Sequence, residues 1–250
     1  RDMLLGRFSP DIDLAVNGDA LLFGNWIADR LSGTCIPLDR ERGIARVIVS
    51  LEGTDSHVVD LTSFSGEIIE DLSRRDFTIN TLALSLGEIG TLNPKAGIID
   101  PFGGMNDLRN GLIQAVQDKI FIDDSLRLLR APRLAHQLGF AITEQTKSLI
   151  KRDALLLNSQ AGEHQREELL YLLDPPGALS GLMLLDQLGL LRIVFPDIEL
   201  GRGVEQPNEH YWDVFEHNLQ CVSAVEEVIH QCSATIGRER ALEFIPWEEN

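Results

Sequence analysis

The stretch DIDLAVNGDALLFGNWIADRLS, residues 11–32, contains the change of period that decides the fold of the N-terminal region. Residues 11–16 alternate in a way that predicts a half-buried strand, whereas residues 19–32 repeat apolar side chains at helical spacing. Between them, Asn17, Gly18 and Asp19 are typical of a turn followed by a helix N-cap. The first predicted unit is therefore a strand followed directly by a helix.

Two β-rich runs follow, at residues 46–51 and 57–61. The segment Glu-Gly-Thr-Asp between them is typical of a turn, so the two runs are predicted to form a hairpin. A helix is then expected over residues 74–86, and a turn at residues 93–97. Strands and helices are thus mixed in residues 1–116, which predicts an α+β domain.

The pattern changes from about residue 122, because helical periodicity recurs and no β-rich run intervenes. Pro132 falls within the first helical segment and predicts a kink or break there. Residues 201–209 are loop-like, and helical spacing returns after them. The predicted helices span residues 123–138, 143–157, 163–173, 177–191 and 211–232.

The predicted organisation has three parts: a mixed-sheet α+β domain over residues 1–116, a helical region over residues 117–200, and the start of a further helical domain over residues 201–250. Residues 246–250 end without a capping signal. We therefore expect this sequence to be a fragment of a longer protein.

The composition excludes several classes of protein. The chain has 250 residues, of which 44% are hydrophobic, so it can bury a core and is not collagen-like, a disulfide scaffold or wholly disordered. Cys35, Cys221 and Cys232 match no CxxC pattern, and any disulfide scheme leaves one of them unpaired, which predicts a reducing compartment such as the cytoplasm. No run of about 18 apolar residues is present, so no membrane-spanning segment is expected.

The charge balance is acidic, with 22 Lys and Arg against 39 Asp and Glu and a formal net charge of −17. Nonspecific affinity for phosphate backbones comes from Lys and Arg, so this excess of acid argues against a generic nucleic-acid coat protein. It suits either a solvated surface or carboxylates gathered to hold a metal ion.

Asp11 and Asp13 are candidate metal ligands. Two residues apart on a strand, they project from the same face of the sheet. Paired carboxylate oxygens can hold Mg²⁺ and leave positions for phosphate and water, although acids at a strand end can also be merely solvated. Asp60 interrupts an apolar run and is either an outward-facing residue or a third member of this acidic cluster.

The segment RRDFTIN, residues 74–80, offers groups for a nucleotide. Arg74 and Arg75 can bind a triphosphate through bidentate contacts, and Asp76 with Asn80, one helical turn apart, can bind a ribose hydroxyl. The alternative is a first helical turn with solvated charges.

The segment DDSLRLLRAPR, residues 123–133, places Asp124 and Arg127 one turn apart, where an acceptor and a fork of donors can match the edge of a base. The alternative is a surface ion pair at i and i+3. Arg130 and Arg133 continue the same spacing of three residues.

A third candidate cluster contains His210, Asp213 and His217. Its spacing fits no standard zinc site, and the sequence contains no His-Asp dipeptide, so structural or solvent-facing histidines are favoured over metal ligands.

Taken in order, these segments resemble the class II nucleotidyltransferases. That family contains the tRNA CCA-adding enzymes, their CC-adding and A-adding relatives and the bacterial poly(A) polymerases, within the polymerase-β-like superfamily. The matches cover roughly residues 1–200. They are RDMLLGR with Asp11-Ile12-Asp13 for the GGxVRDxLLGR…DxD opening, RRDFTIN at 74–80 for RRDFTINA, DPFGG at 100–104, DDSLR at 123–127 for EDxxR, and REEL at 166–169.

The resemblance implies a nucleotidyltransferase head over residues 1–116, followed by a helical neck and body. It also implies that Asp11 and Asp13 hold two Mg²⁺ ions for in-line attack of an RNA 3′-hydroxyl on the α-phosphorus of a nucleotide. Asp60 is a further candidate catalytic acid. The implied nucleotide-binding residues are Arg1, Arg74 and Arg75 for phosphate, Asp76 and Asn80 for ribose, and Asp124, Arg127, Arg130 and Arg133 in the base-reading segment.

Three departures from the family pattern stand out. The Gly-Gly pair before Arg1 is absent, Asp123 replaces Glu, and residues 39–46 stand where CCA-adding enzymes carry a flexible loop. Residues 210–220 resemble the entry to an HD-type domain.

The implied function is addition of CMP and AMP from CTP and ATP to the tRNA 3′ end. Poly(A) polymerase, an HD-type metal-dependent phosphohydrolase and a nucleotide-binding regulatory module remain alternatives. The acidic charge predicts that most RNA affinity comes from a more basic C-terminal body outside this chain. Neither the choice among CCA, CC, A and poly(A) addition nor the oligomeric state follows from the sequence.

Overall fold

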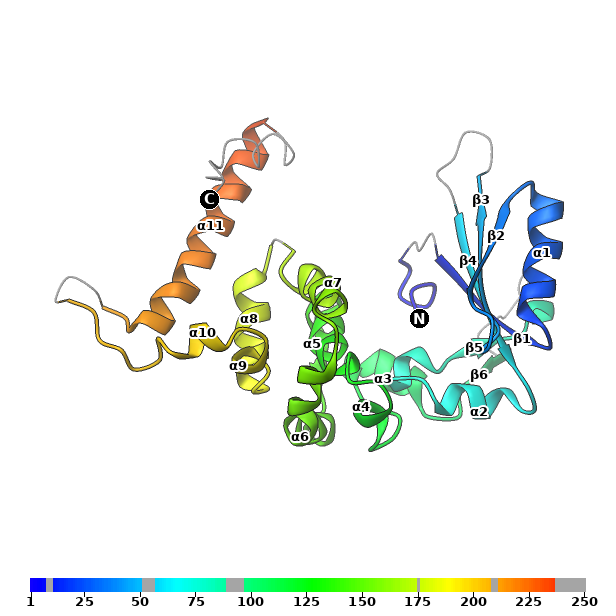
Figure 1. Cartoon of the computed structure of the whole chain (residues 1–250), viewed down its shortest axis with the longest axis horizontal. Coiled ribbons are helices and arrows are strands. Elements are labelled where there is room, and N and C mark those ends of the chain that lie inside the picture. Colours follow the sequence, from blue (N-terminus) through cyan, green and yellow to red (C-terminus); the bar gives the residue numbers. More distant parts are fainter. Residues whose placement is uncertain (8–10, 51–56, 89–96, 175, 208–210, 237–250) are drawn as a thin grey trace. The chain divides into compact units, whose positions relative to one another are not determined.

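A computed structural model of the chain describes residues 1–7, 11–50, 57–88, 97–174, 176–207 and 211–236 (Figure 1). For residues 11 and 232–236 it describes the backbone only. The turn predicted between residues 51 and 57 lies outside this part of the chain, as do residues 93–96 of the second predicted turn and His210. The chain divides into two compact units, Arg1–Leu108 and Arg109–Asn250. The predicted α+β class is confirmed.

The first unit is built on a four-stranded mixed sheet of order β1-β4-β3-β2. Strand β1 (Asp11–Asn17) runs parallel to β4 (His57–Phe64), while β2 (Thr34–Asp39) and β3 (Ile44–Val49) complete an antiparallel set. The predicted hairpin is confirmed as β3 and β4. The sequence did not indicate β2, because it is an edge strand with an irregular register at Pro37 and lacks regular buried alternation.

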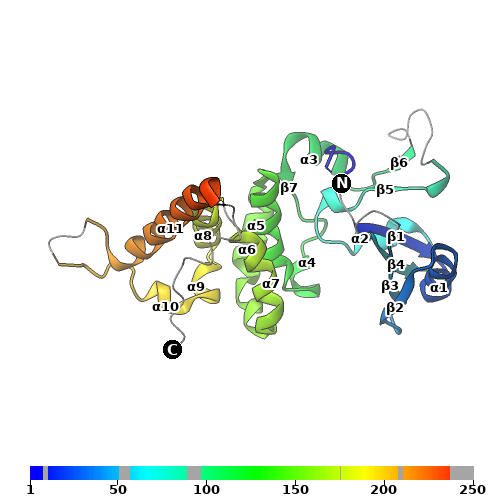
Figure 2. The same cartoon turned by 90° about the horizontal axis from the view of Figure 1, so that it is seen from above.

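Helix α1 (Ala20–Leu31) packs on one face of this sheet, as Figures 1 and 2 show. It begins after the predicted cap, because the Asp19 carboxylate accepts hydrogen bonds from the backbone N–H groups of Leu21 and Leu22 at 2.9 and 3.0 Å. The opposite face of the sheet therefore carries the alternate residues of each strand, among them Asp13, Arg46 and Asp60. The buried core between helix and sheet contains Ala20, Ala28, Ala45, Val47, Val49, Val59 and Leu61.

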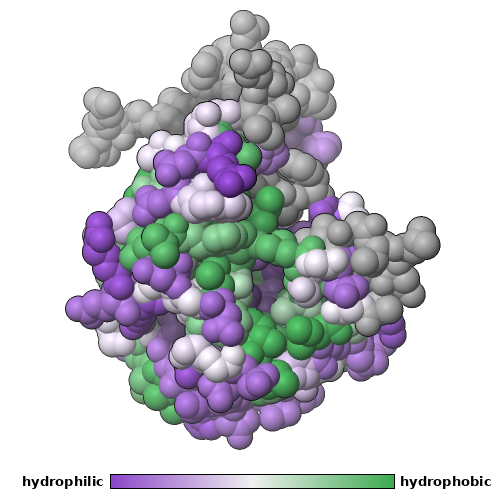
Figure 3. Space-filling view, turned by 90° about the vertical axis from the view of Figure 1, so that its right-hand side faces the viewer, coloured by the Kyte–Doolittle hydropathy of each residue, from purple (hydrophilic) through white to green (hydrophobic). Residues whose placement is uncertain are grey.

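The outer side of α1 carries exposed apolar side chains, among them Leu22 and Trp26. The Trp26 ring stacks on Phe23 with centroids 5.4 Å apart, and the Arg30 guanidinium lies 4.5 Å from the Trp26 ring centroid. Hydrophobic side chains gather on this side of the first unit in Figure 3. The aromatic and cationic neighbours cover part of Trp26, whereas Leu22 is 71% exposed.

The helix predicted over residues 74–86 is wrong. Helix α2 (Ile68–Ser73) ends before it, and the segment instead forms a 3₁₀ turn η1 (Thr78–Asn80), a short strand β5 (Ala83–Leu84) and a 3₁₀ turn η2 (Leu86–Glu88). Phe77 adopts an extended backbone, with φ −122° and ψ 149°, and its ring is fully buried. Burial of this ring, together with neighbouring β-branched residues that lose side-chain freedom in a helix, overrides the apparent helical period.

Strand β5 pairs with β6 (Ile98–Ile99), and the chain then enters α3 (Gly104–Asn110). The Asp100 carboxylate accepts hydrogen bonds from the backbone N–H groups of Gly104 and Met105 at 2.7 and 2.9 Å. The DPFGG segment is therefore the N-terminal cap of α3.

In its described residues, the second unit is helical apart from a two-residue parallel pairing between β7 (Leu112–Ile113) and β8 (Ala141–Ile142), which the sequence did not indicate. Pro132 lies inside α5 and is buried, and the helix continues past it. The helices are α4 (Ile120–Asp123), α5 (Arg127–Leu138), α6 (Glu144–Asp153), η4 (Ala154–Ser159), α7 (Gly162–Leu172), α8 (Ala178–Gln187), α9 (Leu191–Val194), α10 (Pro196–Glu199) and α11 (Val214–Ile236).

Helix α11 is joined to the start of α8 by one carboxylate. Glu226 accepts hydrogen bonds from the backbone N–H groups of Gly177 and Ala178, both at 2.6 Å, and of Leu179 at 3.2 Å. Burial alone would raise the pKa of Glu226, but these donors and the nearby His136 hold it below its ordinary value. Within the described residues, no helix is both long and apolar enough to cross a bilayer.

Candidate active site

Three carboxylate positions meet on the sheet face opposite α1. Asp11 and Asp13 lie two residues apart on β1, so their backbone positions belong to one face of the sheet, and Asp13 stands directly opposite Asp60 of β4 in the parallel register. Asp13 is exposed to solvent and Asp60 is partly exposed. The two alternatives for Asp60 are therefore compatible, because it faces outward and also lies beside Asp13.

Asp60 is held by Arg46, which sequence reasoning did not single out. Arg46 of β3 is its cross-strand neighbour, and Nε and Nη2 of Arg46 donate to Oδ1 and Oδ2 of Asp60 at 2.7 and 2.8 Å. The two-pronged geometry orients the carboxylate on the sheet face. The available signal was a basic residue in one β-rich run and an acidic residue in the next, but their pairing depends on the hairpin register.

The donor set on this face suits a divalent cation. Carboxylate oxygens are the ligands that Mg²⁺ prefers, and adjacent strands present the two described acids, Asp13 and Asp60, side by side. Among the described side chains, no group of three or more His, Cys, Asp or Glu is gathered at metal-binding distances. The residues fit a site completed in part by phosphate and water, with Asp11 placed by its backbone on the same face.

The RRDFTIN segment brings Asp76 and Asn80 together, as their spacing predicts, although a 3₁₀ turn does so instead of a helix, and Arg1 contacts Asn80. The Asp76 side chain, in a residue only 7% exposed, accepts hydrogen bonds from the Phe77 backbone N–H at 2.7 Å and from the Asn80 amide at 2.9 Å. The side-chain amide oxygen of Asn80, Oδ1, accepts a hydrogen bond from Nη1 of Arg1 at 3.1 Å. Asp76 thus orients Asn80, and Asn80 holds Arg1 together with Asp2, whose carboxylate accepts from Nε and Nη2 of Arg1 at 3.0 and 2.8 Å.

The DPFGG segment packs closely against this turn. Thr78 donates from its hydroxyl to Asp107 at 2.6 Å, and a Cβ atom at Gly104 would collide with the carbonyl oxygen of Thr78. Only glycine fits there without a shift of backbone, so the two segments form one rigid support. Sequence reasoning placed both segments in the family pattern, with Asp107 as the acid that follows DPFGG, and gave Asp107 no role of its own.

The two arginines of the segment have different surroundings. Arg75 donates to the Asn80 backbone carbonyl at 3.5 Å and contacts the Asp71 carboxylate at 3.4 Å. Arg74 is exposed and helps to line a pocket of about 310 Å³ at the ends of β1 and β4. The pocket is lined by Asn17, Gly18, Ser63, Phe64, Ser65, Glu70, Asp71 and Arg74.

In the second unit, the predicted base-reading pair lies at the start of α5. Oδ2 of Asp124 is 3.5 Å from Nε of Arg127, and Oδ1 of Asp124 accepts a hydrogen bond from the Leu126 backbone N–H at 3.0 Å. Arg127 also donates to the Ile120 carbonyl at 3.4 Å. These contacts hold the acceptor and the donor fork side by side.

Arg130 and Arg133 are fixed by Glu168 of α7. The Glu168 carboxylate lies 3.1 Å from Nε of Arg130 and 2.5 Å from Nε of Arg133, and its side chain is only 9% exposed. The Arg133 guanidinium also lies 5.5 Å from the ring centroid of Tyr171. Glu168 belongs to the REEL segment, and the contact identifies it as the residue that orients both arginines.

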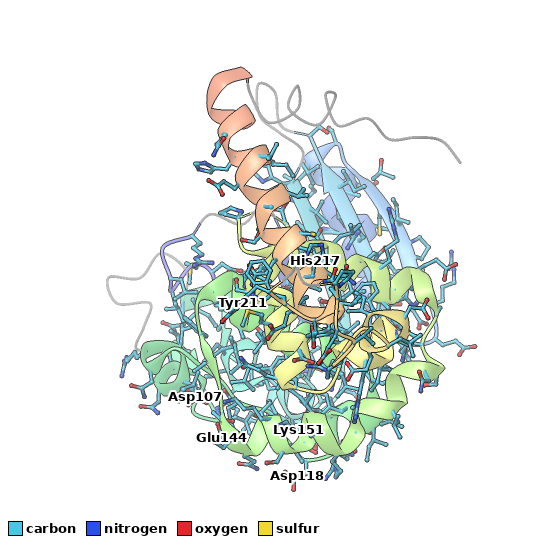
Figure 4. The ribbon with its side chains drawn as sticks, turned by 90° about the vertical axis from the view of Figure 1, so that its left-hand side faces the viewer. Asp107, Asp118, Glu144, Lys151, Tyr211 and His217 are labelled. Atoms are coloured by element: carbon cyan, nitrogen blue, oxygen red, sulfur yellow. The ribbon has the colours of Figure 1, made fainter. Side chains whose placement is uncertain are left out.

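In the candidate cluster of His210, Asp213 and His217, the structure describes Asp213 and His217, and their contacts are those of structural residues. Asp213 accepts hydrogen bonds from the backbone N–H groups of Glu216 and Gly203 at 2.7 and 2.8 Å, and these bonds lower its pKa. His217, labelled with Tyr211 in Figure 4, lies 3.6 Å from the Cys221 sulfur. Asp213 is therefore occupied by backbone donors, as expected of a structural residue.

Comparison with known proteins finds two family matches along the chain. The family described as "Poly A polymerase head domain" matches residues 1–114, and the one described as "Probable RNA and SrmB- binding site of polymerase A" matches residues 139–200. The A-adding tRNA nucleotidyltransferase of Deinococcus radiodurans is 34% identical over 227 residues, covering 89% of this chain and 49% of that protein. The CC-adding tRNA nucleotidyltransferase of Geobacter sulfurreducens is 39% identical over 195 residues, covering 78% and 43%.

Solved structures show the same similarity. The Thermotoga maritima CCA-adding enzyme complexed with tRNA-CCA has a TM-score of 0.72 at 28% identity, covering 100% of this chain and 57% of that one. A tRNA-processing enzyme with CTP has a TM-score of 0.74 at 27% identity, covering 96% and 60%. The chain spans about half the length of the curated relatives it matches. Since sequence motifs, fold and relatives agree, the chain belongs to the class II nucleotidyltransferase family of tRNA CCA-, CC- and A-adding enzymes and bacterial poly(A) polymerases.

Proposed function

We propose that the protein adds CMP or AMP, from CTP or ATP, to the 3′ end of tRNA without a nucleic-acid template. The observation that carries this proposal is the in-register placement of Asp13 and Asp60, in the same compact unit as the Arg1, Asn80 and Asp76 network. The relatives named as A-adding and CC-adding tRNA nucleotidyltransferases support it. So do related structures described as containing CTP or tRNA.

We propose that residues 1–116 form the catalytic head, residues 117–200 the helical neck and residues 201–250 the start of a helical body. The metal of this site is proposed to be Mg²⁺, held by Asp11 and Asp13, with Asp60 as a further catalytic acid. Nucleotidyltransferases of this family need divalent metal ions, and the all-carboxylate donor set favours Mg²⁺ among them. When bound, the metal would lower the pKa of the RNA 3′-hydroxyl and neutralise the triphosphate.

The chain's own residues bind and orient the substrates. Arg74, which lines the pocket at the ends of β1 and β4, and Arg75 bind phosphate oxygens, and Arg1, held by Asn80 and Asp2, serves the same purpose. Asn80, oriented by the buried Asp76, binds the ribose hydroxyls. These contacts place the nucleotide without regard to its base.

Base selection is assigned to the second unit. Asp124 accepts from the exocyclic amine of cytosine or adenine, and Arg127 donates to a ring nitrogen of the same edge. Arg130 and Arg133, held by Glu168, complete the proposed nucleotide-binding set. The cytoplasm is proposed as the compartment. The proposed substrates, tRNA and nucleoside triphosphates, are present there, and its reducing conditions agree with the free thiols of the described cysteines Cys35 and Cys221.

The test is incorporation of single nucleotides by the full-length protein. It should be incubated with tRNAs that end before the first C, at C, at CC and at CCA, with a divalent metal and each labelled triphosphate in turn. Incorporation of neither CMP nor AMP would refute the proposal. Addition of A alone to tRNA ending in CC would identify an A-adding enzyme, and addition of C alone a CC-adding enzyme.

Poly(A) polymerase is the second candidate, favoured by the family description that matches residues 1–114. Long homopolymeric tails on RNAs unrelated to tRNA would support it over the first proposal. An HD-type phosphohydrolase has less support, because this sequence contains no His-Asp dipeptide.

A further inference from the structure

Arg46 occupies an unusual position for a cation, since it lies on the same sheet face as the acids proposed to bind metal. The register places Asp13, Asp60 and Arg46 in one row across β1, β4 and β3. Adjacent strands lie about 4.8 Å apart, so Arg46 begins roughly 10 Å from Asp13 at the backbone. Its side chain then reaches back toward the acids, because it meets Asp60 on the intervening strand.

The Arg46 contact uses the part of Asp60 that a metal ion would use. Nε and Nη2 bond one carboxylate oxygen each, at 2.7 and 2.8 Å, so the guanidinium faces both oxygens at once. A divalent cation binding side-on to Asp60 would meet this guanidinium at close range. Because the Arg46 and Asp60 side chains are 42% and 29% exposed, solvent weakens the pair and leaves it exchangeable.

We propose that the Arg46 guanidinium takes the place of a metal ion beside Asp60. It holds the Asp60 carboxylate in the metal-free protein and lowers the affinity of this sheet face for a divalent cation that binds without a nucleotide. The inference rests on the proposed function, which assigns the metal to Asp11 and Asp13 with Asp60 as a catalytic acid beside them, and it adds Asp60 as a metal ligand. A nucleotide brings negative phosphates that offset the charge of Arg46, so metal and nucleotide bind best together. Arg46 is therefore a positioning residue that acts through Asp60.

The experiment is a titration of the full-length protein with Mn²⁺ alone, following the free-ion signal by electron paramagnetic resonance. Arg46→Gln should bind Mn²⁺ about threefold to tenfold more tightly than wild type, the range expected when one positive charge near a divalent ion is removed in a partly solvated site. Asp60→Asn should bind it more weakly. Arg46→Lys keeps the charge but loses the two-pronged bond, and its Mn²⁺ affinity should lie closer to that of wild type than the affinity of Arg46→Gln does.

Arg42→Gln is the matched control, because Arg42 carries the same charge in the turn between β2 and β3 and its side chain is 81% exposed. Circular dichroism establishes that each variant is folded, and Arg46→Met repeats the charge removal if the Gln variant is not. Equal Mn²⁺ affinities in the Arg46→Gln and Arg42→Gln variants would overturn the proposal. Weakening by Arg46→Gln to the level of Asp60→Asn would also overturn it, because Arg46 would then serve to present a ligand.

This titration contains neither nucleotide nor RNA, so its outcome is separate from the incorporation assay. If wild-type protein incorporates no nucleotide, the proposed function fails while the Mn²⁺ comparison still reports on Arg46. If wild-type protein incorporates nucleotide and the Arg46 variants bind Mn²⁺ like wild type, only the inference about Arg46 fails.

Discussion

Replacing Glu168 by Gln is expected to weaken the contact between α5 and α7, because one carboxylate holds both Arg130 and Arg133. Removing one partner of a fully buried ion pair costs about 3–5 kcal/mol. Here the two arginine side chains are 32% and 19% exposed, so water recovers part of that cost. The Gln side chain also keeps one acceptor, and we therefore expect a loss of about 1.5–3 kcal/mol in unfolding free energy.

The assay is urea unfolding followed by far-UV circular dichroism, which reports mainly on the helical second unit. Glu167→Gln is the matched control, because Glu167 lies on the same helix and is exposed. The control is expected to change the unfolding free energy by less than about 0.5 kcal/mol. If Glu168→Gln destabilised the protein no more than this control, the contact of Glu168 with Arg130 and Arg133 would not contribute to stability and the reasoning would be wrong.

Three further predictions concern the proposed metal ligand Asp13, the close packing at Gly104 and the cap formed by Glu226. Asp13→Ala should abolish nucleotide incorporation at unchanged melting temperature; a rate within a few-fold of wild type would contradict the metal assignment. Gly104→Ala should lower the melting temperature strongly, because its Cβ would meet the Thr78 carbonyl, whereas Gly87→Ala, with only a side-chain atom at 3.8 Å, should be mild. The lowered pKa of Glu226 means that its carboxylate stabilises the fold above the ordinary Glu pKa and loses this effect as pH falls through the lowered value. Melting curves of Glu226→Gln should therefore show weaker acid dependence than wild type, and an unchanged dependence would count against the cap.

Local sequence predicted those parts of the fold that local forces determine. The strand and helix around Asp19 follow from side-chain period and from one capping carboxylate, and both are confirmed. The segment at 74–86 has an apparent helical period, but burial of Phe77 in an extended backbone depends on contacts far along the chain. Strand β2 is an edge strand that contains Pro37, so its sequence resembles a loop.

The candidate site likewise contains some residues that local sequence predicts and others whose contacts depend on distant parts of the chain. Motif spacing alone identified Asp13, Asp76 and Asn80 as site candidates, and the structure brings Asp76 and Asn80 into contact. Arg46 and Glu168 were not identified as site residues, because each gains its partner across two elements. The cross-strand register and the packing of α5 on α7 decide those contacts, and neither can be read from single-residue patterns.

The strand order has a consequence for how the acidic face is assembled during folding. Strands β3 and β4 are neighbours in sequence and can pair early, whereas the paired residues Asp13 of β1 and Asp60 of β4 lie 60 − 13 = 47 positions apart along the chain. Asp60 and Arg46 therefore meet as soon as the hairpin forms, and Asp13 joins them only when the parallel pairing is complete. Before β1 pairs with β4, the Arg46 guanidinium already compensates the charge of Asp60. A partly folded chain would therefore bind divalent cations more weakly at this face.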